Sequence, residues 1–494
     1  MIDTQAIRKK ILDLALRGKL TEQLQEDGTG QELFQQIKER KAALAGTGKT
    51  KKQESLIPLS EEDIPFEIPD NWQWVRLGDI TSKITSGSTP TGGKKSNAYV
   101  DKGFCFFREQ NIYNDGIHSE GMVYITEQLL DTRENSTVIA KDILLNITGG
   151  SIGRCAIVPD DFSKGSINQH ILIIRMVEEE TRFFTHLVLC SPYAQNHIKS
   201  KAVGDKDGFS GGRCKYMPVP LPPLPVQKRI VSIIHSAFSV LDTIDTLQSQ
   251  YQENLATLKS KIIDAGIQGK LTEQLPEDGT AEELCQQIQA EKAALEKAGK
   301  IKKSKPLPPI DEEEKPFDIP ANWKWVRLID IIYDKPTNGF SPKGVDYPTK
   351  IKNLTLTATT SGVFKPEAYK YVDIPLEAAN KYWLVKDDIL IQRSNSAELV
   401  GTSCVFTGQD HEYIYPDLIM RIHVLPMVHT EYVARILKAP FTRQYYMSRA
   451  SGSSGSMPKI NQDTVSNTLI PLPPLAEQKR IVAKLEELMA VCGE

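Results

Sequence analysis

The sequence repeats itself along most of its length, with corresponding residues 251 positions apart. The segment KKILDLALRGKLTEQLQEDGTGQELFQQI at 9–37 returns as KSKIIDAGIQGKLTEQLPEDGTAEELCQQI at 259–288. The same spacing relates IPFEIPDNWQWVRLGDI at 64–80 to KPFDIPANWKWVRLIDI at 315–331, and VPLPPLPVQKRIV at 219–231 to IPLPPLAEQKRIV at 470–482. Three matches at one spacing indicate an internal duplication, so the chain is expected to build one structural frame twice.

The segments enclosed by these repeats differ from each other. The stretch from Trp72 to Pro220 is as long as the stretch from Trp323 to Pro471, yet the two share little sequence. One repeated frame therefore carries two unlike inserts.

The frame is predicted to be helical. Apolar residues recur in steps of three and four, the pattern of a coiled-coil seam with Gln248 as its one polar interruption: Ile234, Ala237, Leu241, Ile244, Tyr251, Leu255, Leu258, Ile262 and Ala265. Pro225 suits the first turn of a helix, and the Gly266–Gly269 stretch suits its end. A helix over 225–265 would be about 60 Å long.

The two ends of the chain complete this pattern. Residues 476–494 match only the beginning of the central helix and residues 1–20 match only its end, so together they make about one further copy. This circular arrangement predicts that the central helix runs antiparallel to the terminal pieces and that a pseudo-twofold axis relates the inserts. The alternative is that the termini are frayed helices.

Two kinds of connector join the frame to the inserts. Residues 46–63 and 299–314 change from lysine-rich through proline to acidic, which is typical of a solvated linker. The PLPPL runs at 220–224 and 471–475 are predicted to be stiff polyproline II spacers, with ligands for a proline-binding domain as the alternative.

Composition limits the classes of protein that remain. A chain of 494 residues with 40% apolar and 25% charged residues fits a globular protein of about three to four structural units. We see no apolar run of the roughly 18 to 20 residues that cross a membrane, and expect a cytoplasmic protein. Its seven cysteines are widely spaced without a CxxC motif, which predicts neither disulfides nor a zinc site. The net charge of −3 excludes DNA binding through bulk charge and leaves local basic faces.

The duplicated motifs resemble one known family. A P-x-NWxWVRL opening (Trp72, Trp74, Trp323, Trp325), a PLPPLxxQKRIV closing and a GKLTxQL segment after a helix are similar to those of type I restriction-modification specificity subunits. The resemblance spans essentially the whole chain. The first insert departs from the family by ending in DGFSGGRCKYMPVPLPPL, whereas the second keeps the more typical SGSSGSMPKINQDTVSNTLIPLPPL.

This resemblance implies a role without catalysis. Each insert would be a target-recognition domain that reads one half of a bipartite double-stranded DNA site, and the helices would bind two methyltransferase subunits. Restriction and translocase subunits would complete the complex, so S-adenosylmethionine, ATP, magnesium and the catalytic residues would belong to the partners. We therefore expect no cofactor and no metal in this chain. Contacts with the partner subunits are predicted for Gln227, Arg229, Leu241, Tyr251, Leu255, Gln478 and Arg480.

Local positive charge and loop chemistry indicate where DNA could bind. Residues 432–462 contain five basic residues and no acidic one, and residues 183–215 are similarly rich in lysine and arginine. Such charge anchors phosphates, whereas Arg, Asn and Gln forks in loops read base edges. The alternative for each basic segment is a solvated amphipathic helix. Predicted DNA-contacting residues are Ser86, Thr89, Lys94, Lys95, Arg108, Gln110, Asn111, Arg154, Lys199, Lys201, Lys206, Arg213 and Lys215 in the first insert, and Lys343, Lys352, Asn353, Arg393, Asn395, Arg443, Tyr446, Arg449, Ser453, Ser454 and Lys459 in the second.

Signatures of catalysis are weak throughout the sequence. ALAGTGKT at 43–50 fits a relaxed phosphate-loop pattern, but it follows a predicted helix, and its repeat copy ALEKAGKI at 294–301 lacks the hydroxyl that would bind magnesium. YPDLIMRIH at 415–423 lacks the paired acid and lysine of a nuclease core and is interpreted as a strand. Two other functions stay open: a non-sequence-specific coiled-coil adaptor that never reads DNA, and a fragment of a single-chain restriction-methylation enzyme.

The sequence thus predicts an α+β protein with two recognition domains joined by a long antiparallel coiled coil. The predicted boundaries are an N-terminal helical region and linker at 1–60, a first target-recognition domain at 61–224, a central coiled-coil region and linker at 225–311, a second target-recognition domain at 312–475, and a partial C-terminal helix at 476–494.

Overall fold

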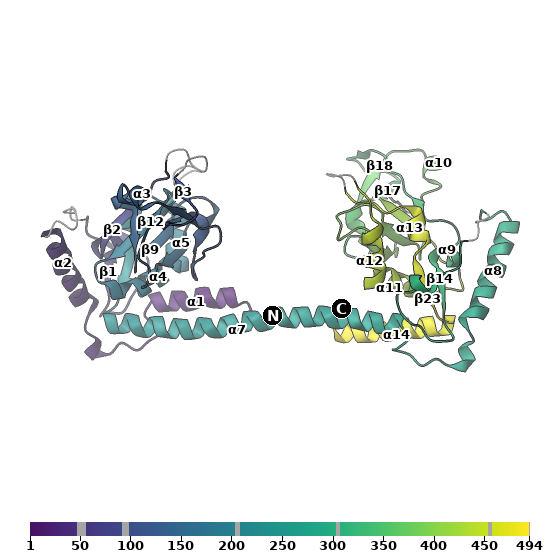
Figure 1. Ribbon diagram of the computed structural model, residues 1–494, viewed down its shortest axis with the longest axis horizontal. Coiled ribbons are helices and arrows are strands. Elements are labelled where there is room, and N and C mark those ends of the chain that lie inside the picture. Colours follow the sequence, from purple (N-terminus) through teal and green to yellow (C-terminus); the bar gives the residue numbers. More distant parts are fainter. Residues whose placement is uncertain (47–55, 91–97, 203–207, 303–306, 453–456, 494) are drawn as a thin grey trace. The chain divides into compact units, whose positions relative to one another are not determined.

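The computed structural model describes residues 1–46, 56–90, 98–202, 208–302, 307–452 and 457–493 (Figure 1). Contacts divide the chain into two compact units, Met1–Ser249 and Gln250–Glu494. The boundary falls within helix α7 (Leu224–Ile267), which is one continuous helix of 44 residues. Its ends agree with the predicted start near Pro225 and the predicted stop after Gly266.

In the first unit, helix α1 (Thr4–Leu16) lies antiparallel along the first half of α7 (Figure 1). The Thr4 hydroxyl donates to Asp245, and Arg8 forms ion pairs with Asp242 and Asp245 at 2.9 Å. Further along α1, Leu12 and Leu16 are buried in the same core as Ile234 of α7. The N-terminus is therefore a packed helix and not a frayed one.

In the second unit, helix α14 (Leu475–Val491) lies antiparallel along the second half of α7. A Cβ atom added to Gly266 would lie 3.1 Å from Leu485 Cδ2, so the glycine permits close packing of the two helices. Each unit has an ion pair at the corner near the start of its frame helix. Arg480 of α14 bonds Asp278 at 3.0 Å, just as Arg229 of α7 bonds Asp27 at 2.7 Å. The predicted circular arrangement is confirmed within each unit, and the pseudo-twofold axis stays a prediction.

The predicted seam of α7 is confirmed in part. Ile234 and Leu241 are buried. Tyr251 and Leu258 are 61% and 48% exposed, so their prediction as seam residues that pack inside the chain is wrong.

Helix α7 also corrects the expectation that no segment could cross a membrane. By length and composition alone it is apolar enough for a span. Core helices of soluble proteins can have the same length and composition. The first half of α7 also carries Asp242 and Asp245, which pair with Arg8.

Two main sheets form the body of the first unit. One has the order β10-β9-β12-β2 and the other β3-β7-β4-β11-β8, with β5 and β6 as a separate hairpin. The strands are β2 (Thr81–Ser86), β3 (Tyr99–Val100), β4 (Phe104–Phe107), β5 (Ile112–Tyr113), β6 (Gly116–Ile117), β7 (Val123–Ile125), β8 (Thr137–Ile139), β9 (Ile143–Asn146), β10 (Cys155–Ile157), β11 (Lys164–Ile167) and β12 (Ile171–Met176). The helices are α2 (Gly30–Gly46), α3 (Glu127–Asp131), α4 (Arg182–Cys190), α5 (Pro192–Lys201) and α6 (Gly211–Tyr216). One core joins α1, α4 and the four-stranded sheet, and a second lies between the two sheets.

The second unit repeats this plan. Its sheets have the orders β15-β22-β19-β20 and β16-β18-β17-β21. The strands are β15 (Thr337–Asn338), β16 (Gly344–Val345), β17 (Ile351–Leu354), β18 (Tyr369–Val372), β19 (Ile389–Gln392), β20 (Ser403–Val405), β21 (Tyr413–Ile414) and β22 (Ile419–Ile422). The helices are α8 (Ala281–Lys297), α9 (Leu328–Ile331), α10 (Leu376–Ala379), α11 (Thr430–Lys438), α12 (Pro440–Arg449) and α13 (Gln462–Ser466). Unlike inserts thus fold on one plan.

A two-stranded sheet closes each insert. Strands β1 (Gln73–Arg76) and β13 (Pro218–Leu221) pair with Trp74 opposite Pro220, and β14 (Lys324–Arg327) and β23 (Leu469–Leu472) pair with Trp325 opposite Pro471. The prolines of β13 alternate along the strand, so the missing N–H groups fall on one side and the ladder to β1 is kept. The predicted polyproline II spacers are therefore wrong for the first half of each run, which is a β-strand.

Candidate nucleic-acid interface

Four loops of the first unit meet at one end of its four-stranded sheet. The backbone N–H of Ile147 donates to the His170 carbonyl at 3.0 Å, and the N–H of Phe209 donates to the Ile147 carbonyl at 2.9 Å. Gly87 packs against the same turn, since an added Cβ would lie 2.1 Å from the Ile167 carbonyl oxygen. We name residues 86–90, 146–148, 167–170 and 208–210 the loop edge of the first unit.

The second unit has a loop edge with equivalent contacts, formed by residues 338–341, 392–395, 415–418 and 459–461. The N–H of Arg393 donates to the Leu418 carbonyl at 2.8 Å, and the N–H of Ile460 donates to the Arg393 carbonyl at 2.9 Å. A Cβ added to Gly339 would lie 2.0 Å from the Tyr415 carbonyl oxygen. The two backbones correspond contact by contact.

The side chains on the two loop edges differ. The first carries the neutral groups of Thr89 and Gln169 together with His170, whereas the second carries Ser341 and the charged groups of Asp417, Arg393 and Lys459. Equal backbones with unlike polar side chains can present two different hydrogen-bonding patterns to a ligand.

A hydrogen bond to a carboxylate holds the turn at residues 167–170 of the first loop edge. Glu109 accepts a hydrogen bond from the Asn168 amide at 2.7 Å. Burial opposes ionisation of Glu109, but this hydrogen bond and nearby positive charge hold its pKa below the ordinary value. The turn that presents Gln169 is therefore braced by a carboxylate.

Several predicted DNA-contacting residues belong to these edges. Ser86 and Thr89 are exposed on the first, and Arg393, Asn395 and Lys459 lie on the second, with Lys343 exposed shortly after it. The predicted residues Lys94, Lys95, Lys206, Ser453 and Ser454 lie outside the described residues. Those on the edges remain predictions.

The other predicted DNA-contacting residues near the first loop edge have different surroundings. Arg108 and Gln110 both reach the Gly121 carbonyl oxygen, and the Arg154 guanidinium lies 4.5 Å from the centre of the Tyr113 ring. Asn111 is fully buried, and its amide nitrogen donates to two backbone carbonyls at 3.1 Å. The prediction that Asn111 touches DNA is wrong, since its side chain holds a loop together.

One predicted contact of the second unit, Asn353, is corrected in the same way, and its neighbour Lys352 stays a prediction. Asn353 is fully buried and donates to the Phe340 carbonyl at 3.0 Å. Lys352 pairs with Glu412 at 2.5 Å, and this hydrogen bond raises the pKa of the lysine. Its charge is already neutralised within the chain.

The basic helices of the first unit keep their charge accessible. Lys199, Lys201 and Arg213 are exposed, and a hydrogen bond of 2.7 Å from Arg213 to the Lys201 carbonyl joins helix α6 to helix α5. Lys215 is half-buried. The end of α5 and the neighbouring α6 therefore carry exposed cations within the predicted basic segment.

In the corresponding helix α12, two predicted contact residues form hydrogen bonds within the chain. Arg443 donates to the carbonyls of Val400 and Glu398 at 2.6 and 2.8 Å, and burial lowers its pKa. Tyr446 is fully buried, and its hydroxyl lies 2.9 Å from that of Thr468. The prediction of DNA contact is wrong for Tyr446, whose hydroxyl is used inside the domain, and stays a prediction for the half-buried Arg443.

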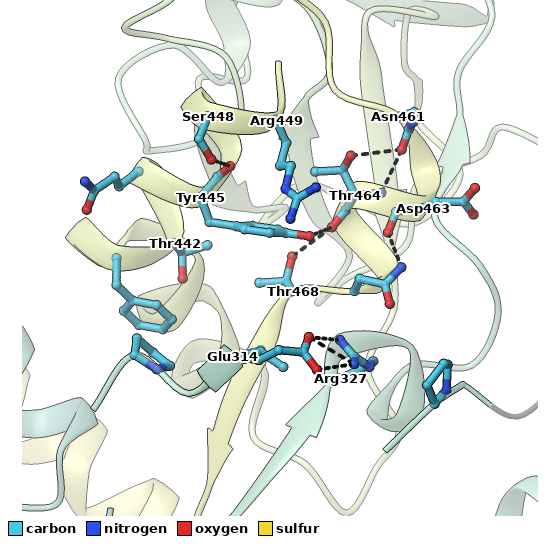
Figure 2. A pocket seen from close by; sticks show the side chains of 16 residues that line it. Glu314, Arg327, Thr442, Tyr445, Ser448, Arg449, Asn461, Asp463, Thr464 and Thr468 are labelled. Atoms are coloured by element: carbon cyan, nitrogen blue, oxygen red, sulfur yellow. Dashed lines mark hydrogen bonds and ion pairs between the residues drawn. The ribbon is translucent and has the colours of Figure 1, made fainter. Parts of the chain in front are cut away.

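A pocket of about 770 Å³ lies beside α12 and α13 in the second unit (Figure 2). Arg449, another predicted DNA contact, lines it with its guanidinium 5.8 Å from the Tyr445 ring centre. Glu314 and Arg327 also line it and form a two-pronged ion pair at 3.0 and 3.2 Å. In the first unit the matching Arg76 lies 5.3 Å from the Tyr216 ring centre.

The predicted subunit-interface residues are of two kinds. Gln227 and Gln478 are buried and donate to the carbonyls of Pro222 and Pro473 at 2.8 and 2.9 Å, so they brace the closing segments and their prediction as partner contacts is wrong. Leu241 is buried in the first unit, and Arg229 and Arg480 form the corner ion pairs described above. Leu255 is partly exposed, and Tyr251 is open to solvent.

The polar residues of the loop edges that were not predicted include Gln169, His170 and Asp417. Each sits in a tight turn between two apolar runs, INQHILII and IYPDLIM. This position between strands is the signal that could have indicated them. Within the described residues, no group of three or more His, Cys, Asp or Glu side chains could hold a metal ion.

Comparison with known proteins places this geometry in a family. Residues 69–252 and 320–493 match the family described as type I restriction modification DNA specificity domain. The chain belongs to this family. Each unit carries one copy of the specificity domain, and the resemblance seen in the sequence is confirmed.

Relatives and solved structures agree with this assignment. The chain is 27% identical to the type I restriction enzyme EcoEI specificity subunit of Escherichia coli, over 99% of this chain and 89% of the relative. It is 29% identical to the EcoAI specificity subunit of the same organism, over the same shares. A solved chain of the type I restriction-modification system has a TM-score of 0.57 at 18% identity, covering 87% of this chain and 93% of that one. The HsdS subunit of Thermoanaerobacter tengcongensis has a TM-score of 0.50 at 18% identity, covering 87% and 92%. These structures confirm the α+β fold with a long helix.

Proposed function

We propose that this chain reads a bipartite, asymmetric DNA target for a type I restriction-modification complex, with one half-site read by each unit. The observation that carries the proposal is the pair of loop edges, which share a backbone and differ in their polar side chains. Two loop edges with the same backbone and different polar side chains can recognise a DNA target whose halves differ in sequence.

Charge near the loop edges supports binding to a phosphate backbone. The chain is acidic overall, with a net charge of −3, yet Lys199, Lys201 and Arg213 are exposed together in the first unit. Arg393 and Lys459 lie on the loop edge of the second. Local cations release condensed counterions from DNA when they bind, which supplies affinity without requiring a basic protein.

The helical frame would hold two methyltransferase subunits. On α7 the first unit exposes Ile233, Val240 and Leu247, and the second exposes Tyr251 and Leu258. Apolar side chains at such spacing form a stripe on a helix, which favours contact with a partner protein. Methyl transfer, ATP hydrolysis and DNA cleavage, with S-adenosylmethionine, ATP and magnesium, would then belong to the methyltransferase and restriction subunits, in the cytoplasm.

Methylation mapping tests the reading function. The chain is co-expressed with its methyltransferase subunits in a host without DNA methylation, and methylated adenines are located by sequencing the genome. We expect one motif made of two unlike halves around an unread gap of fixed length. Methylation without a motif, or methyl transfer by the purified chain alone, would contradict the proposal.

The docking surface is tested separately. Tyr251→Glu and Leu258→Glu should weaken binding of the methyltransferase subunits by about 10-fold or more, because a charge would be buried in an apolar contact. Ser249→Glu, exposed on the opposite face of the same helix, is the matched control and should bind as the wild type does. Equal binding by all variants would place the docking surface elsewhere.

A further inference from the structure

We infer that Gln169 and Asp417 are equivalent base-reading residues, with Gln169 selecting adenine in one half-site and Asp417 selecting cytosine in the other. This inference rests on the proposed function and names the side chains through which two base pairs of the target are recognised.

The two residues occupy the same position on the two loop edges. Gln169 lies in the turn between β11 and β12, and Asp417 lies in the turn between β21 and β22. Both side chains are exposed, whereas the flanking strands are largely buried. The glycine contacts and the backbone hydrogen bonds that hold the two turns correspond, so each fold presents one polar side chain at the same place.

A hydroxyl group holds the side chains of Gln169 and Asp417. In each unit this hydroxyl lies two residues after the glycine of the loop edge, Gly87 or Gly339. Thr89 Oγ1 donates to Gln169 Oε1, and Ser341 Oγ donates to Asp417 Oδ1. The backbone N–H of Asp417 in turn donates to Ser341 Oγ at 3.1 Å. An exposed polar side chain that is held by its own fold loses less conformational freedom when it binds, which is the condition for selective recognition.

The orientation of the Gln169 amide is fixed at its other end as well. Its nitrogen lies 3.1 Å from His170 Nε2, and His170 Nδ1 lies 2.7 Å from Thr148 Oγ1. With Thr89 donating to the amide oxygen, the nitrogen must be the donor toward His170. One amide hydrogen and one lone pair remain, and these are the donor and acceptor that pair with N7 and N6 of adenine.

Asp417 offers acceptors only. Within the described residues it forms no ion pair, and its carboxylate contacts Ser341. An unpaired anion on a surface that binds DNA is repelled by the phosphates, so it favours binding only if a base donates a hydrogen bond to it. In the major groove the amino group of cytosine is such a donor.

The charges around Asp417 would position it for this contact. Arg393 is tied through its backbone to the neighbouring Leu418, and Lys459 lies on the adjoining loop. These cations can bind phosphates on either side of the base pair. In the first unit the corresponding turn carries no acid, and Lys199, Lys201 and Arg213 are exposed on α5 and α6.

Exchanging the two side chains tests the inference. Gln169→Asp and Asp417→Gln are each co-expressed with the methyltransferase subunits, and the methylated motif is mapped as for the wild type. We expect Gln169→Asp to replace one A·T pair by C·G in one half-site and leave the other half unchanged. Asp417→Gln should make the opposite change in the other half-site.

Two alanine variants test the inference even if the exchanged side chains do not recognise a new base. Gln169→Ala and Asp417→Ala should each relax one position of the motif, with discrimination against the wrong base falling about 5- to 150-fold. Gln36→Ala, at an exposed residue of helix α2 outside the loop edge, is the control and should keep the wild-type motif. A variant that loses methylation is compared with wild type by competition between the mapped target and single-base substitutions.

The outcomes separate this inference from the proposed function. A bipartite wild-type motif that stays unchanged in all four variants would overturn the inference and leave the reading function intact. Such a result would mean that Thr89 and Ser341 only brace the turns. A wild type without a bipartite motif would contradict the reading function itself.

Discussion

At the level of single residues, one ion pair is repeated at the corner between the helices of each unit. Arg229 is on α7 and bonds Asp27 at 2.7 Å, and Arg480 on α14 bonds Asp278 at 3.0 Å. The two carboxylate side chains are 3% and 5% exposed. Hydrogen bonding by Arg229 is the main reason that the pKa of Asp27 lies below its ordinary value.

Removing this arginine should destabilise the fold. Arg229→Met leaves the Asp27 carboxylate with little solvent and no cation, so we expect a loss of about 2 kcal/mol in the free energy of unfolding, discounted because Arg229 itself is partly exposed. Urea denaturation of the full chain measures it. Lys228→Met removes a surface pair with Glu180 whose side chains are 62% and 46% exposed, and it should cost less than about 1 kcal/mol. Similar losses for both variants would show that burial does not strengthen the pair.

The same pair predicts the sign of a pH effect. Because folding lowers the pKa of Asp27, its contribution is fully present above the ordinary value of 3.8 and is lost as the pH falls through the folded-state pKa. The difference in stability between wild type and Arg229→Met should therefore be constant near neutral pH and shrink only as the pH falls below 3.8. A difference that grew on acidification would contradict this assignment.

At the level of elements, α7 serves both units. Its first half packs on α1 and its second half on α14, whereas residues 249–254 between these pairs are all exposed. An insertion in this exposed stretch therefore disturbs neither helix pair. If α7 sets the distance between the two half-sites, its length should determine the length of the unread gap.

Inserting seven residues after Gln250 tests this role of α7. One heptad lengthens a helix by about 10.5 Å and turns it by only about 20°. We expect the gap in the methylated motif to grow by about three base pairs, with both half-sites unchanged. Inserting five residues is the control, because it turns the helix by about 140° and should abolish methylation. A motif with an unchanged gap after the heptad insertion would exclude α7 as the spacer.

Helices α7, α1 and α14 could be predicted from the sequence because their signals are local or repeated. The three-and-four spacing indicates α7, and the matching ends of the chain indicate α1 and α14. The loop edges depend on contacts between distant residues, such as Gly87 with Ile167, which no single segment encodes. Asn111 and Asn353 were mispredicted for this reason, since loop chemistry alone does not distinguish an amide that reads a base from one that braces a backbone.

At the level of the whole molecule, each recognition domain has its own core and its own closing sheet. The second domain is closed by β14 and β23, where Val326 lies opposite Ile470. Residues just inside these strands, including Ile332 and Val424, share a core with α14 and the frame. Exchange of the domain must therefore respect the pairing of β14 with β23.

Exchanging the second recognition domain should change one half-site only. An exchange of residues 332–470 would divide β23, so we define the exchanged segment as 328–468 and keep both closing strands. A chimera carrying the corresponding segment of another family member should methylate a motif with one new half, one old half and the same gap, because the first unit and α7 are untouched. The chimera cut at 332 and 470 is the matched control and should be less stable to urea. A chimera whose motif changes in both halves would show that the two domains do not read DNA independently.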